Sequence, residues 1–84
     1  MRVGTQCTGT VAAGATDRWF THSWDPTHHV VWTVVPITPG PGAPQIEWDV
    51  EVQRASTTTL TYWLAVKNLS AAPVDIEIRF AVLD

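Results

Sequence analysis

Three segments in the second half of the chain carry rows of apolar side chains at alternate positions, with mostly polar residues between them. They span residues 45–54, 59–68 and 74–83, and every second residue in each is apolar. A period of two is typical of β-strands with one buried face and one face in water. The links at residues 55–58 and 68–73 are short, so we expect these strands to form an antiparallel β-meander.

The first half of the chain is less regular but also favours strands. Residues 29–35 are β-branched and aromatic on both faces, and Pro36 ends the run because proline cannot donate to a sheet ladder. Residues 38–44 hold three prolines and two glycines, which is typical of an exposed loop. Residues 6–13 and 18–24 complete a set of six strands. The pattern predicts an all-β fold, a six-stranded antiparallel β-sandwich that occupies residues 1–84 as a single domain.

Composition narrows the function classes. The chain has 84 residues, 45% of them hydrophobic and 15% charged, which excludes a disordered chain. Its net charge of -3 and lack of a basic patch argue against nucleic acid as a partner. No apolar run is long enough for a membrane span. The single cysteine, Cys7, forms no intramolecular disulfide, and a monomer this small is only marginally stable, so we expect self-association.

Candidate chemistry is sparse. The chain lacks a nucleophile elbow, a phosphate-binding loop and a dinucleotide-binding loop, so we expect no enzyme and no cofactor. His22, His28 and His29 lie near Asp25, but adjacent strand residues point to opposite faces. This favours solvated or hydrogen-bonded histidines over a metal site.

The five tryptophans are the most informative residues. Trp32 and Trp48 are in phase with the apolar rows, which predicts that they lie in the core. Trp63 is out of phase with its row, as are Ala81 and Leu83 with theirs, which predicts an outward contact surface for a ligand or another subunit.

Trp19 and Trp24 flank His22 close to Asp25 and allow two interpretations. Aromatic rings beside polar side chains suit sugar binding, because a pyranose stacks its C–H face on a ring while polar groups bind its hydroxyls. Alternatively, both rings close one end of the core. A further motif, Asn68-Leu69-Ser70, fits the N-glycosylation pattern in what we expect to be an accessible turn.

The order of these features resembles the H-type lectins, which are small six-stranded β-sandwiches. The similar features are Arg2-Val3, Cys7, Trp19, an aromatic strand ending at Trp24, the valine-rich residues 30–35, and three alternating strands to the end of the chain. The resemblance implies binding of N-acetylgalactosamine and assembly as trimers. In that family an N-terminal Asp, a basic strand residue and an aromatic–polar pair contact the sugar. Here no Asp lies between Cys7 and Asp17, while Arg54 and Trp63 stand on comparable strands.

Together these observations predict a tryptophan-rich homo-oligomer that binds a glycan at a shallow site. The candidate ligand-binding residues are Trp19, His22, Trp24 and Asp25 at one strand end, or Trp63 with Arg54 on an outer face. The alternative is an immunoglobulin-like structural or protein-interaction sandwich that self-assembles and has no catalytic activity. No apolar leader follows Met1, so a complete chain is expected in the cytoplasm.

Overall fold

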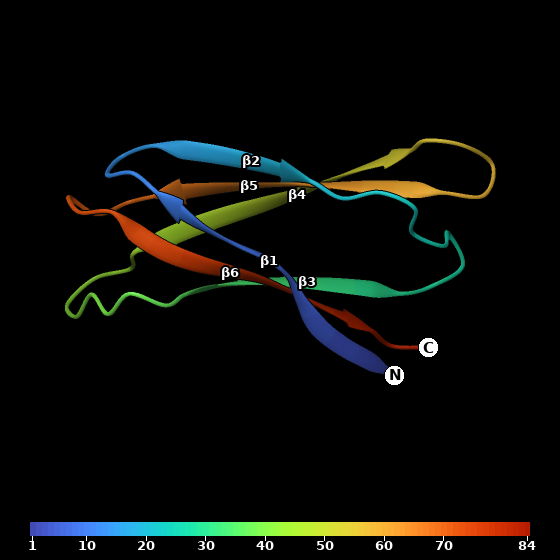
Figure 1. The fold of residues 1–84 in the computed structure, drawn as a ribbon, viewed down its shortest axis with the longest axis horizontal. Coiled ribbons are helices and arrows are strands. Elements are labelled where there is room, and N and C mark those ends of the chain that lie inside the picture. Colours follow the sequence, from blue (N-terminus) through green and yellow to red (C-terminus); the bar gives the residue numbers. More distant parts are fainter.

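Six β-strands and no helix make up the computed structural model, which describes residues 1–84 (Figure 1). The strands are β1 (Arg2–Val11), β2 (Thr16–Phe20), β3 (Val30–Pro36), β4 (Ile46–Arg54), β5 (Leu60–Asn68) and β6 (Val74–Val82). All pairings are antiparallel. The predicted all-β class with six strands is therefore confirmed. β2 ends earlier than expected, and Trp24 makes only an isolated bridge to Leu60.

The strands form two three-stranded sheets, in the orders β1-β6-β3 and β2-β5-β4. The predicted meander is therefore wrong, because β5 pairs with β4 and β2 while β6 belongs to the other sheet. The link between β5 and β6 is a crossover between the sheets. A period of two shows that a strand has one buried face. The pattern is the same whether the next strand in the chain pairs with it in one sheet or packs against it from the other sheet.

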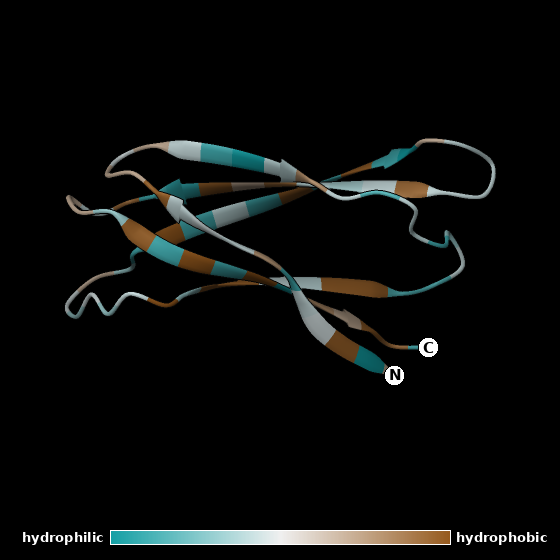
Figure 2. Cartoon of the chain, viewed as in Figure 1, coloured by the Kyte–Doolittle hydropathy of each residue, from teal (hydrophilic) through white to brown (hydrophobic).

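The core lies between the two sheets and is built from the inward rows of the alternating strands. Figure 2 shows the brown and teal bands that alternate along β4 and β6. The buried cluster contains Val11, Trp32, Val34, Tyr62, Leu64, Val66, Val74, Ile76 and Ile78. Each aliphatic side chain buried in this way contributes about 1.5–3 kcal/mol. Trp32 belongs to the cluster and Trp48 packs against it, as the phase of their strands predicts.

Asn68, at the end of β5, holds the crossover to β6 in place. Its side chain is fully buried, and its Nδ2 donates to the carbonyls of Val11 at 3.0 Å and Ala72 at 2.8 Å. Its Oδ1 accepts from the backbone N–H of Ser70 at 2.8 Å. The expected accessibility of the glycosylation motif is therefore wrong, because the amide nitrogen that would carry the sugar is enclosed and bonded.

Candidate functional site

An aromatic pair lies on the outer face of the β2-β5-β4 sheet. Phe20 of β2 stands opposite Trp63 of β5, and Glu51 of β4 stands opposite Trp63 on its other side. The two aromatic rings are 5.3 Å apart with an interplanar angle of 35°. Phe20 is 61% exposed, an unusual state for a large aromatic side chain. Trp63 thus occupies the outer face, as its phase predicts.

Trp63 is half-buried because neighbouring side chains cover part of its ring. The guanidinium of Arg18 lies 4.6 Å from the centroid of the indole, a cation–π contact. Arg18 Nη2 also donates to Glu51 Oε1 at 2.7 Å, so this side chain crosses β5 from β2 to β4. The indole N–H of Trp63 donates to Gln53 Oε1 at 3.2 Å. We call Phe20, Trp63, Arg18, Glu51 and Gln53 the Phe20–Trp63 platform.

His22 lies at the rim of this platform. Its ring is 6.3 Å from the ring of Phe20, and its Nδ1 is 3.1 Å from the hydroxyl of Ser23. Ser23 has a φ of 65°, which is uncommon for a residue other than glycine and turns the chain just after His22. The imidazole therefore adds a polar, exposed group beside the aromatic pair.

Trp24 and Trp19 pack into the sandwich. Trp24 meets Trp32, Tyr62 and Phe80 edge-on, with ring centroids 5.3, 6.1 and 5.3 Å away. Its indole N–H donates to Thr21 Oγ1 at 2.8 Å. Such edge-to-face contacts favour packing of the core.

Trp19 also packs against the core, with its ring over Gly9 of β1. The rings of Trp19 and Trp24 therefore pack against the core. His22, in contrast, lies on the outer face beside Phe20.

Asp25 stabilises the turn between β2 and β3. It accepts the backbone N–H of Thr27 at 2.9 Å and the Thr27 hydroxyl at 2.8 Å. The backbone hydrogen bond, followed by the hydroxyl, lowers the pKa of the Asp25 carboxyl.

Two histidine–carboxylate pairs lie near this turn. His28 Nε2 is 3.7 Å from Asp25, and His29 Nδ1 is 2.7 Å from Asp84. No group of three or more histidine, cysteine, aspartate or glutamate side chains lies close enough to hold a metal ion.

Arg54 lies on the other face of its sheet from Trp63. It stands opposite Leu60, whereas the next residue toward the strand centre, Gln53, shares the face of Trp63. Its Nη2 donates to the carbonyl of Thr57 within the β4–β5 hairpin, at 2.9 Å. The expected pairing of Arg54 with Trp63 on one outer face is therefore wrong, because adjacent strand residues point to opposite faces.

The sequence interpretation missed Phe20, Arg18, Glu51 and Gln53 as site residues. A sequence signal was available for Phe20. The available signal was the doublet of Trp19 and Phe20. In a strand, adjacent aromatic side chains point to opposite faces, so burial of one ring exposes the other.

Comparison of the chain with protein-family models, curated proteins and solved structures gives no match. The structure holds no helix of the length and apolar character needed to cross a membrane.

Proposed function

We propose that this chain is a non-catalytic carbohydrate-binding module whose Phe20–Trp63 platform binds a pyranose. The observation that carries the proposal is the exposed Phe20 ring, which lies beside Trp63 on the outer face of a sheet and is bordered by polar side chains. The C–H face of a sugar ring stacks on such an aromatic surface. Its hydroxyls find donors in Arg18 and acceptors in Glu51 and Gln53, with His22 at the rim.

A single platform of this kind binds weakly. It is a surface rather than an enclosed pocket, so only one face of the sugar loses contact with water. The corresponding dissociation constant is about 1 mM, or about −4 kcal/mol. Several copies or a repeating glycan raise the overall affinity through effective concentration.

Isothermal titration with a panel of neutral, N-acetylated and acidic sugars tests this proposal, and the panel includes N-acetylgalactosamine. We expect Phe20→Ala to weaken binding of the preferred sugar at least about tenfold, which equals 1.4 kcal/mol. The matched control is Val52→Ala, because Val52 is 59% exposed on the same sheet but points to the other face. Equal affinities for both variants, or no binding to any sugar, would refute the proposal.

A second candidate function is self-association through the other sheet. Ala81 of β6 stands between Val3 of β1 and Val31 of β3 on the outer face of the β1-β6-β3 sheet. Val3, Val31 and the nearby Leu83 are exposed, and exposed apolar rows of this kind favour a protein interface. Since Trp63 lies on the opposite outer face of the sandwich, one partner surface does not cover both sets of residues.

Light scattering separates this candidate from the first. A stable dimer or trimer that becomes monomeric in Val31→Lys supports an interface on the β1-β6-β3 sheet. A wild-type monomer at micromolar concentration excludes it and leaves the carbohydrate proposal untouched.

A further inference from the structure

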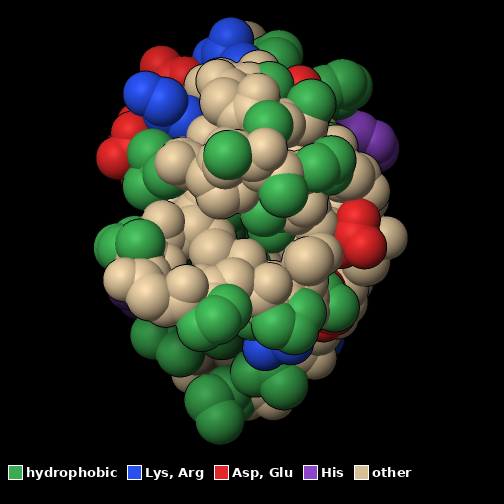
Figure 3. Space-filling view, turned by 90° about the vertical axis from the view of Figure 1, so that its left-hand side faces the viewer, with side chains coloured by type: hydrophobic (Ala, Val, Ile, Leu, Met, Phe, Trp, Pro, Cys, Tyr) green, Lys and Arg blue, Asp and Glu red, His purple; other side chains and the backbone are tan.

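A preformed pocket lies between two connections at one end of the sandwich. One wall is the loop between β3 and β4, and the other is the crossover between β5 and β6. Figure 1 shows both segments at the left-hand end, whereas β2 runs away from that end and finishes near the middle of the view, at Phe20. None of the residues that line the pocket belongs to the Phe20–Trp63 platform. The pocket is therefore separate from the Phe20–Trp63 platform. Figure 3 looks onto this end of the molecule.

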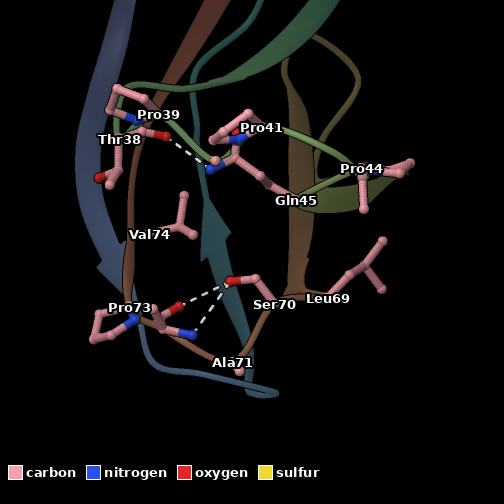
Figure 4. A pocket seen from close by; sticks show the side chains of 13 residues that line it. Thr38, Pro39, Pro41, Pro44, Gln45, Leu69, Ser70, Ala71, Pro73 and Val74 are labelled. Carbon is pink, nitrogen blue, oxygen red and sulfur yellow. Dashed lines mark hydrogen bonds between the residues drawn. The ribbon is translucent and has the colours of Figure 1, made fainter.

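The lining of the pocket is uncharged and largely apolar. Its volume is about 320 Å³, and none of its thirteen lining residues carries a charged side chain. Four of the thirteen are prolines, namely Pro39, Pro41, Pro44 and Pro73. In Figure 4, Val74 lies between the proline-rich loop on one side and the Ser70–Pro73 crossover on the other. Val74 itself is buried and belongs to the core.

Hydrogen bonds hold both walls before any ligand arrives. Gln45 Nε2 donates to the carbonyl of Thr38 at 2.7 Å, and the backbone N–H of Asp75 donates to Thr38 Oγ1 at 2.9 Å. The N–H of Leu69 donates to the carbonyl of Gln45 at 2.8 Å and thereby joins the two walls. With four fixed proline rings, little conformational entropy is lost on binding.

We infer that this pocket binds a small, neutral molecule with a single aromatic ring system, monocyclic or bicyclic. An ion entering it would lose hydration and find no countercharge, so charged ligands are disfavoured. Proline rings and aromatic rings pack well against each other, as in the recognition of proline-rich segments by aromatic grooves. The volume is at the lower end of the range for ligand pockets, which suits a ring of the size of phenol or indole.

Titration of the isotope-labelled protein with phenol and indole tests this inference by NMR. We expect shifts at Leu69, Ser70 and Val74, and nuclear Overhauser effects between ligand protons and the methyl groups of Leu69 and Val74. Benzoate and benzylammonium carry a charge, and cyclohexanol lacks the aromatic ring. We expect each of the three to bind at least about tenfold more weakly than phenol, a difference of 1.4 kcal/mol.

Leu69→Asp places a charge at the rim, and we expect it to weaken phenol binding at least about tenfold. Leu69 is 44% exposed, so little core packing is lost, and Val52→Asp is the matched control, because Val52 in β4 is 59% exposed and does not line the pocket. Equal binding of cyclohexanol and phenol, or ligand contacts confined to Phe20 and Trp63, would overturn the inference, as would the absence of any shift. Because the wild-type contacts are measured directly, a poorly folded variant does not decide the outcome. Sugar binding at the platform is read from different residues, so either proposal can fail alone.

Discussion

The indole of Trp19 packs directly over the backbone of Gly9. A Cβ atom at position 9 would lie 2.8 Å from Cζ2 of that ring, which is closer than side chains tolerate. Gly9 therefore allows β1 and β2, which belong to different sheets, to approach each other. The absence of a side chain at position 9 therefore leaves the space that the Trp19 ring occupies.

We predict that Gly9→Ala destabilises the fold by about 1–3 kcal/mol, because the added methyl group forces Trp19 or the strand to move. Urea unfolding followed by circular dichroism measures this change. Thr8→Ala on the exposed face of the same strand is the control, with an expected change within about 0.5 kcal/mol. A Gly9→Ala protein as stable as that control would contradict the prediction, because it would show that Trp19 accommodates a methyl group at position 9 without cost.

Asn68 is the other residue on which the fold depends strongly. Asn68→Ala leaves the buried carbonyl of Val11 without this donor, so we predict a loss of about 1–3 kcal/mol in the free energy of unfolding. The same urea titration measures it, with Asn68→Ala compared to Ser56→Ala in the exposed hairpin. In a secretory host the wild-type chain should remain unglycosylated at Asn68 by mass spectrometry, and full occupancy would contradict its burial.

At the scale of elements, alternation predicts strands well and predicts their partners poorly. The rows of β4, β5 and β6 were predictable because water on one face and core on the other impose a period of two. The assignment of β6 to the second sheet was not, since a short link permits a hairpin or a crossover. The buried bond from Asn68 to the carbonyl of Val11, which ties the start of the crossover to the end of β1, joins residues 57 positions apart, and no local pattern reveals it.

For the candidate site, too, alternation predicts which face a residue occupies but not which strands lie beside it. The outward position of Trp63 followed from phase, whereas its neighbours Phe20 and Arg18 depend on the pairing of β2 with β5. Arg54 was wrongly grouped with Trp63, although its phase in β4 already places it on the other face from Gln53.

Arg18 connects both edge strands of its sheet across β5. We predict that Arg18→Ala changes stability by less than about 1 kcal/mol, because both partners of the ion pair with Glu51 are more than half exposed and water screens their attraction. The indole signal of Trp63 should shift in the NMR spectrum while that of buried Trp32 stays in place. An unchanged Trp63 signal would contradict the cation–π contact.

At the scale of the whole molecule, three carboxylates couple stability to pH. The pKa of Asp84 is lowered by a hydrogen bond from the backbone N–H of His29, that of Glu77 by the hydroxyl of Thr5, and that of Asp25 by the backbone N–H of Thr27. A carboxylate whose pKa is lower in the folded state stabilises the fold above its unfolded pKa, which is about 3.9 for Asp and about 4.3 for Glu. This contribution is lost as the pH falls from there through the folded pKa.

We therefore predict that the melting temperature falls as the pH drops below about 4. The slope should be smaller in Asp84→Asn, which has no charge to lose, than in the wild type. Asp49→Asn on the exposed outer face of β4 is the control. Scanning calorimetry between about pH 2 and pH 7 measures the slopes, and parallel curves for wild type and Asp84→Asn would contradict the role of the contact between Asp84 and His29.

The central claim is that the Phe20–Trp63 platform binds a sugar ring, and the five indole N–H signals test it most directly. We expect titration of the labelled wild-type protein with the sugar panel to move the indole signal of Trp63, whose N–H bonds Gln53, together with the ring signals of Phe20. Trp32, buried in the core, should not move. If every sugar leaves Trp63 and Phe20 unchanged, or if shifts arise only elsewhere, the proposed function is wrong.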